Sequence, residues 1–163
     1  MQRRLNLQAR YRIFAALFMA LTVSIATDLF AQKESGVELT TQAGFQYWLG
    51  IDKPAITTES GLQYKALIEG RGRKPKSSAT VSVHYRGILL SGQEFDNSYD
   101  SDEPVRLNLK RVIKGWGEGL QLMPSGSIYV FLIPSELAYG EKGSASIPPD
   151  ADLIFEIELF KSR

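Results

Sequence analysis

Hydrophobic and polar residues alternate with a period of two in several stretches of the chain. The alternation spans residues 62–68, 81–86 and 152–159 and predicts strands that bury one face. Residues 128–133 are apolar throughout, which indicates a central strand buried on both faces. Strands therefore dominate the second half of the sequence.

One helix interrupts these strands. Trp116, Leu120 and Met123 recur at helical spacing after Gly115, and Pro124 ends the pattern. A parallel sheet would need several longer crossover helices. A single short helix on a largely antiparallel sheet predicts an α+β fold.

The chain has no cysteine and a single histidine, His84. The lack of cysteine excludes disulfide scaffolds, zinc ribbons, iron–sulfur centres and thiol nucleophiles. The alternation in residues 81–86 turns Tyr85 inward and His84 outward toward solvent, so a Ser-His-Asp relay lacks its base. The glycines of residues 115–119 match neither a P-loop nor a dinucleotide fingerprint.

The N-terminal residues resemble an export signal. Four arginines precede an apolar run over residues 13–26, which is shorter than the roughly 20 residues of a membrane span. We expect a signal peptide within residues 1–31, cleaved after Ala26 or after Ala31, and an uncleaved membrane anchor is the alternative. Removing the four arginines from the formal charge of +1 leaves −3, which gives no indication of nucleic-acid binding.

Residues 32–60 are polar and mixed, and we expect them to form a short N-terminal arm ahead of a domain over residues 61–163. The apolar pattern within residues 45–49 suits about two helical turns, capped by Thr40 or Thr41. The arm is too short to be a domain of its own.

Five motifs follow one another in the predicted domain: residues 83–87 (VHYRG), 92–96 (GQEFD), 112–120 (VIKGWGEGL), 138–140 (AYG) and 147–149 (IPP). Their order resembles FKBP-type peptidyl-prolyl isomerases, and residues 120–124 resemble the bacterial branch related to macrophage infectivity potentiator proteins. The resemblance implies a half-barrel in which a twisted antiparallel sheet of five to six strands wraps around one short helix. It places the ligand cavity between helix and sheet.

The resemblance also implies a pocket that needs no cofactor and no metal. Trp116 would form its floor, Tyr139 and the Ile113 N–H would donate to substrate carbonyls, and Asp96 would accept a hydrogen bond at the rim. Val105 stands where many members carry an aromatic residue, which affects ligand affinity more than activity. The catalytic positions implied are Tyr85, Phe95, Asp96, Trp116, Tyr139 and Phe155, and the substrate-binding positions are Val105, Val112, Ile113 and Ile147.

These residues suit the rotation of X–Pro bonds, which breaks no covalent bond and needs no nucleophile. We expect a bacterial, periplasmic, monomeric isomerase that acts on proline-containing polypeptides, with macrolides left open as inhibitors. Membrane contact is expected only if the signal stays uncleaved. Two alternatives remain: a chaperone-like module that binds chains in the same cleft with little catalysis, and a domain that docks a partner through residues 32–60.

Overall fold

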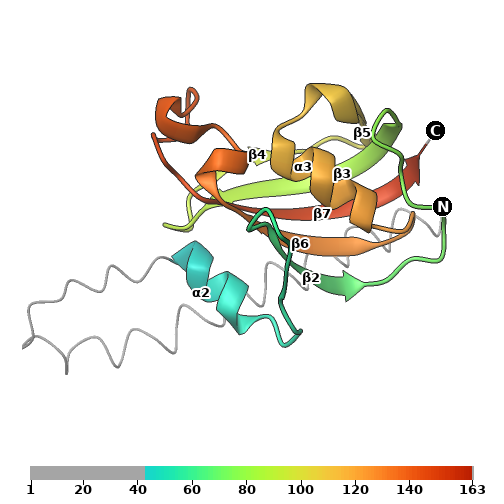
Figure 1. Cartoon of the computed structure of the whole chain (residues 1–163), viewed down its shortest axis with the longest axis horizontal. Coiled ribbons are helices and arrows are strands. Elements are labelled where there is room, and N and C mark those ends of the chain that lie inside the picture. Colours follow the sequence, from blue (N-terminus) through green and yellow to red (C-terminus); the bar gives the residue numbers. More distant parts are fainter. Residues whose placement is uncertain (1–42, 163) are drawn as a thin grey trace, which may run out of the picture. The chain divides into compact units, whose positions relative to one another are not determined.

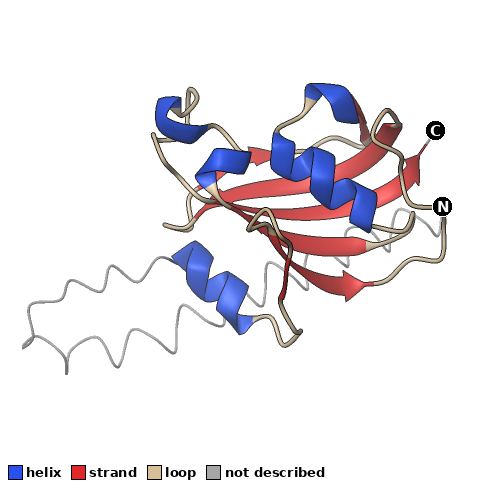
Figure 2. Cartoon of the chain, in the orientation of Figure 1, coloured by secondary structure: helices blue, strands red, loops and turns tan. Residues whose placement is uncertain are grey.

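The computed structural model describes residues 43–162. The expected signal peptide, its two cleavage sites and the caps Thr40 and Thr41 lie outside the described residues. Figures 1 and 2 show the elements of the described part. They are α2 (Ala43–Gly50), β1 (Ile56–Thr57), β2 (Gln63–Ile68), β3 (Thr80–Leu89), β4 (Glu94–Asn97), β5 (Val105–Asn108), the 3-10 helix η1 (Leu109–Arg111), α3 (Lys114–Leu122), β6 (Ile128–Ile133), the 3-10 helices η2 (Ser135–Leu137) and η3 (Gly140–Lys142), and β7 (Leu153–Ser162).

The strands form one antiparallel sheet in the order β1-β2-β6-β7-β3-β4. β5 pairs with residues 80–83 of β3 and β4 pairs with residues 86–88, so these two short strands share one edge of β3. The α+β class and the antiparallel sheet predicted from the sequence are confirmed. The sheet has seven strands, because β1 and the two short strands on β3 join the longer ones.

The inner face of the sheet is apolar and packs against α3 (Figure 2). Phe131 of β6 lies opposite Phe155 of β7, and both point toward the helix that carries Trp116 and Leu120. A Cβ at Gly119 would lie 2.7 Å from Cε1 of Phe131, so glycine at this position lets the helix approach the sheet closely. The helical spacing therefore placed α3 correctly.

The helix α2 packs against the outer face of the same sheet. Tyr47 donates a hydrogen bond from Oη to Oε2 of Glu156 at 2.6 Å, and Gly44 donates from its backbone N–H to the Leu90 carbonyl at 2.9 Å. Glu156 follows Phe155 directly in β7, so its side chain points away from α3. The two helical turns expected near residues 45–49 are present.

Folded structure begins before Gly61, where the sequence pattern placed the start of the domain. Lys65 of β2 donates from Nζ to the Trp48 carbonyl at 2.8 Å and lies 4.7 Å from the centre of the Trp48 ring. β1 precedes Gly61 as well and pairs with β2. Residues ahead of Gly61 therefore contact the sheet, which the sequence of one short amphipathic helix does not reveal.

The prediction that His84 faces solvent is wrong. His84 does lie on the outer face, as the alternation requires, but its side chain is only 1% exposed. Tyr99 stacks on its ring at 5.1 Å and Phe160 meets the ring edge-on at 5.6 Å. These two aromatic residues cover a face that the sequence pattern alone assigned to water.

No helix in residues 43–162 has the length and apolar character needed to cross a membrane.

Candidate functional site

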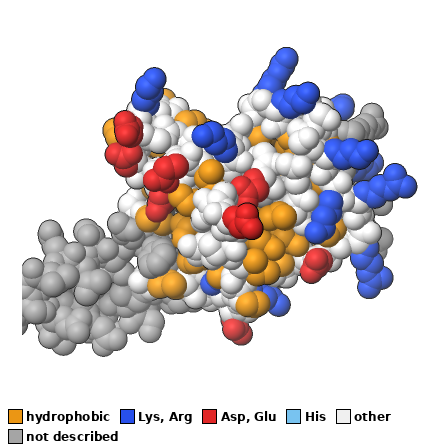
Figure 3. Space-filling view, in the orientation of Figure 1, with side chains coloured by type: hydrophobic (Ala, Val, Ile, Leu, Met, Phe, Trp, Pro, Cys, Tyr) orange, Lys and Arg blue, Asp and Glu red, His pale blue; other side chains and the backbone are white. Residues whose placement is uncertain are grey.

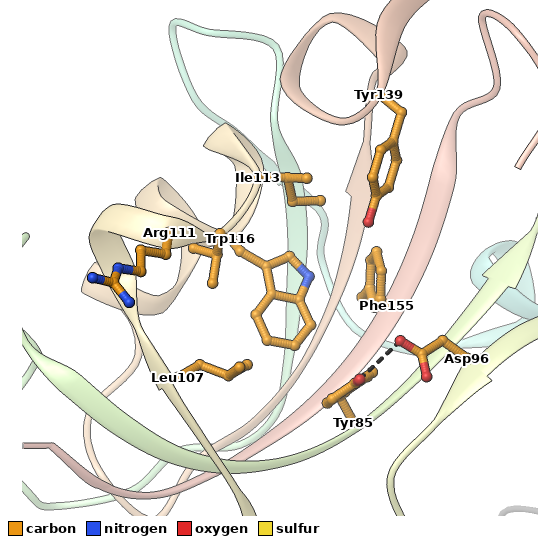
Figure 4. A pocket seen from close by; sticks show the side chains of 9 residues that line it. Tyr85, Asp96, Leu107, Arg111, Ile113, Trp116, Tyr139 and Phe155 are labelled. Carbon is orange, nitrogen blue, oxygen red and sulfur yellow. Dashed lines mark hydrogen bonds between the residues drawn. The ribbon is translucent and has the colours of Figure 1, made fainter. Parts of the chain in front are cut away.

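A pocket of about 460 Å³ opens between the N-terminal half of α3 and the inner face of the sheet (Figure 4). This volume falls within the range of small-molecule and peptide-side-chain sites. Strands β3, β4, β5 and β7, the helix start and the connection after β6 all contribute side chains. The lining residues are Tyr85, Asp96, Leu107, Arg111, Val112, Ile113, Trp116, Tyr139 and Phe155.

Three aromatic rings build the bottom and one wall of this pocket. The Trp116 ring meets Tyr85 at 4.9 Å and Phe155 at 5.2 Å, with interplanar angles of 85° and 86°. Such edge-to-face contacts are favourable and fix the ring orientations. Phe95 packs edge-on against Phe155 at 5.4 Å and supports the wall from behind. The indole of Trp116 is thus held rigidly as an apolar surface.

The indole N–H of Trp116 is buried and finds no hydrogen-bond acceptor within the described part of the chain. It lies among aromatic rings, whose faces accept an N–H only weakly. The bottom of the pocket is therefore an environment from which water is largely excluded.

Tyr85 and Asp96 form a polar pair at one side of the pocket. Oη of Tyr85 donates to Oδ2 of Asp96 at 2.8 Å, as the dashed line in Figure 4 marks. Burial raises the pKa of Tyr85, and the hydrogen bond and negative charge of Asp96 raise it further. Tyr85 therefore stays protonated at neutral pH and holds the carboxylate in place.

Two further donors lie beside the pocket, and neither has a hydrogen-bond partner among residues 43–162. Tyr139 precedes η3, is 38% exposed, and makes no hydrogen bond through its hydroxyl to any residue of 43–162. Burial of its ring and the Asp96 charge raise the pKa of Tyr139, so the hydroxyl keeps its proton. Ile113 is the N-cap of α3, where backbone N–H groups lack intrahelical acceptors. Both donors are available to a ligand.

The structure brings seven of the ten residues named from the resemblance to one pocket. The other three do not line it. Phe95 supports Phe155, Val105 pairs with Val83 across the β3–β5 ladder, and Ile147 is buried in the core beside a bridge to Ser144. Two lining residues, Leu107 and Arg111, were not predicted.

Val105, named from the resemblance, was the signal that could have found Leu107, because the residue two positions along an extended strand lies on the same face. Arg111 is the last residue of η1, directly before Val112, and no periodicity marked it as a pocket residue.

Residues 71–160 match the family of FKBP-type peptidyl-prolyl cis-trans isomerases. The FKBP-type isomerase FkpA of Aeromonas hydrophila is 53% identical over 103 residues, which make up 63% of this chain and 38% of the relative. The isomerase Mip of Coxiella burnetii is 44% identical over 114 residues, 69% of this chain and 50% of the relative. The chain thus spans half or less of the length of these relatives.

Among solved structures, FkpA from Escherichia coli superposes with a TM-score of 0.68 at 36% sequence identity, covering 91% of this chain and 71% of that one. The fold, the order of the motifs and these matches lead to one conclusion. The chain belongs to the family of FKBP-type peptidyl-prolyl cis-trans isomerases.

Proposed function

We propose that the chain accelerates rotation about X–Pro bonds of polypeptides in the pocket above Trp116. The observation that carries the proposal is the combination of a rigid aromatic floor with two unpartnered donors, the Tyr139 hydroxyl and the Ile113 N–H. Family membership supports the same reaction.

The pocket suits this reaction because rotation needs no nucleophile. The barrier of about 18–20 kcal/mol arises from loss of amide conjugation in the twisted state. Water stabilises the polar planar amide more than the twisted one, so transfer to an apolar cavity favours the twisted state. A proline ring placed on the Trp116 indole would enter such a cavity.

The two donors would hold the substrate chain while its bond turns. A hydrogen bond to each flanking carbonyl fixes the peptide. Each tenfold gain in rate requires that the activation free energy fall by about 1.4 kcal/mol. Asp96, held by Tyr85, would accept a hydrogen bond at the rim. A proton transfer is not part of this mechanism.

The test is a protease-free rate measurement on a proline peptide by NMR exchange. Tyr139→Phe removes one donor and is expected to lower kcat/KM by about 5- to 30-fold, corresponding to a hydrogen bond of about 1–2 kcal/mol. Tyr64→Phe is the matched control, because Tyr64 stacks on Tyr129 outside the pocket. Equal rates for Tyr139→Phe and the unaltered chain would contradict the assignment of this donor.

Trp116→Ala tests the floor. Its rate should fall by more than that of Tyr139→Phe, and because Trp116 is buried in the core, its folded fraction must be measured alongside. Suppressed aggregation of an unfolded client, together with no catalysis by the unaltered chain, would favour the chaperone-like module instead.

The remaining features of the proposal concern the whole protein. We infer export to the periplasm from the signal-like residues 1–31 and the bacterial relatives, and we propose a monomeric state. Mass spectrometry of the secreted product should find an N-terminus at Thr27 or Gln32. Light scattering after gel filtration should give the mass of one chain, and the mass of two would contradict the monomer.

A further inference from the structure

One side of the pocket is strongly basic. The segment from β5 to the start of α3 carries four exposed cations, Arg106, Lys110, Arg111 and Lys114, and no acidic residue occurs between Glu103 and Glu118. In Figure 3, Lys and Arg side chains gather on the side of the molecule where β5 lies. The stretch is therefore a continuous positive edge beside the site.

Arg111 is the member of this group that lines the pocket. It lies on the opposite side of Trp116 from Asp96, and its guanidinium points away from the indole toward the outside of the pocket (Figure 4). Asp96 is engaged by Tyr85 across the pocket. No carboxylate within residues 43–162 forms an ion pair with Arg111, so its charge is available to a ligand.

A polypeptide whose proline lies on Trp116 must extend over the rim on both sides. A guanidinium is planar and binds a carboxylate with two parallel hydrogen bonds. At a partly hydrated rim, such a pair contributes modestly and is screened by salt. The cation is therefore suited to selecting substrates rather than to driving the rotation itself.

We propose that Arg111 makes the site selective for X–Pro segments that carry Asp or Glu next to the proline. The inference rests on the proposed function, because it names the substrate class of the same pocket. An acidic side chain on the flank that crosses η1 reaches Arg111, whereas a basic one meets the positive edge of Arg106, Lys110 and Lys114.

The experiment measures kcat/KM by NMR exchange on peptides that differ at one position beside proline. Glu, Gln and Lys are placed in turn before and after the proline, so that both flanks are sampled. At about 0.02 M salt, kcat/KM for the Glu peptide should exceed that for the Gln peptide by about 2- to 5-fold on one flank. On the same flank, kcat/KM for the Lys peptide should be lower than that for the Gln peptide. The preference should shrink at about 0.5 M salt.

Two variants identify the responsible residue. Arg111→Gln should bring the Glu/Gln ratio to one, and Arg111→Glu should invert it. Lys76→Glu is the control, because it makes the same charge change at an exposed loop position that does not line the pocket, and the ratio should persist. Thermal unfolding establishes that each variant is folded before its ratio is compared.

The outcomes separate the two proposals. The proposed selectivity is overturned if the peptides are isomerised with no preference for Glu on either flank. It is also overturned if the preference is unchanged in Arg111→Gln. Both outcomes leave the proposed isomerase function intact. Absence of catalysis on every peptide overturns the proposed function and this inference with it.

Discussion

At the scale of single residues, Ser98 connects the two faces of β3. Its Oγ accepts a hydrogen bond from the Tyr85 backbone N–H at 2.7 Å and lies 3.1 Å from Nδ1 of His84. The Ser98 backbone N–H also donates to the Tyr85 carbonyl at 2.9 Å. Because Tyr85 holds Asp96, Ser98 positions the polar pair of the pocket without lining it.

Replacing Ser98 with alanine should therefore affect both stability and the site. The Tyr85 N–H loses its acceptor, and a partly buried unpaired donor lowers the free energy of unfolding by about 1–3 kcal/mol. Urea unfolding measures this loss, and the rate on a proline peptide should fall with it. Ser91→Ala is the control, since Ser91 is exposed and accepts only a 3.4 Å contact from Gln93. Equal stabilities of the two variants would contradict this role.

His84 gives a second prediction at this scale. Burial lowers its pKa below the ordinary value of 6.5, and the hydrogen bond with Ser98 and the negative charge of Glu103 only partly oppose this. The folded state thus binds the proton less tightly than the unfolded state, so stability falls as pH drops below 6.5. The imidazole signals of this single histidine should titrate by NMR with a midpoint below 6.5, and nearer 6.5 in urea. A midpoint above 6.5 in the folded state would contradict this prediction for His84.

The residues that sequence reasoning misjudged share a physical cause. Alternation places a side chain on a face of a strand but does not say what covers that face, so His84 was assigned to solvent although Tyr99 and Phe160 enclose it. Likewise, Leu107 lines the pocket and Val105 does not, although both lie on one face of β5, and only the tertiary fold determines which of the two reaches the pocket.

At the scale of elements, α3 carries three glycines, and two of them, Gly117 and Gly119, lie in different surroundings. A Cβ at Gly119 would lie 2.7 Å from Cε1 of Phe131, whereas a Cβ at Gly117 would have its nearest neighbour, the Leu109 carbonyl oxygen, at 3.6 Å. Gly119 is therefore needed for the contact between helix and sheet. Gly117 leaves room for a methyl group and weakens the helix through its backbone freedom.

The two alanine variants should therefore change stability in opposite directions. Gly117→Ala should raise the free energy of unfolding by about 0.5–1 kcal/mol, because alanine favours the helix. Gly119→Ala should lower it by about 1–3 kcal/mol, because the Phe131 ring must shift. Urea unfolding of both, side by side, measures the difference. A stabilising Gly119→Ala would show that α3 is not held close to β6.

Strongly periodic elements could be predicted from the sequence, and short ones could not. The strands near residues 62–68, 128–133 and 152–159 and the helix at Trp116 follow from local patterns that burial imposes. β1 has two residues and β4 and β5 have four each, too few to establish a period. Their existence depends on pairing with a neighbouring strand, which is a tertiary property.

At the scale of the whole molecule, the sheet separates two different environments. Its inner face is apolar and carries the pocket, while its outer face buries charged and polar groups beneath α2 and the loop after β4. Lys65, Glu156 and Arg86 lie in one row across the outer face. The stability of the domain should therefore depend on pH mainly through this outer face.

Glu156 contributes one part of the pH dependence of stability, and its pKa shift determines whether that part increases or decreases with pH. Burial raises the pKa of Glu156, and the hydrogen bond from Tyr47 and the charge of Arg86 only partly counter it. The folded state then holds the proton more tightly than the unfolded state, so stability decreases as pH rises from the ordinary value of 4.5 toward the raised folded pKa. This direction is opposite to that of His84 over the range where both titrate.

The variant Glu156→Gln isolates the contribution of Glu156. His84 titrates in both chains, so its contribution cancels when the free energy of unfolding of the unaltered chain is subtracted. The variant loses the titrating group but keeps an acceptor for Tyr47, so its stability relative to the unaltered chain should increase from pH 4 to pH 7. Urea unfolding at several pH values measures this difference. Glu59→Gln, at an exposed position, controls for the loss of one negative charge. A relative stability that stays flat or decreases with pH would mean that α2 and its tyrosine stabilise the charged carboxylate more than burial destabilises it.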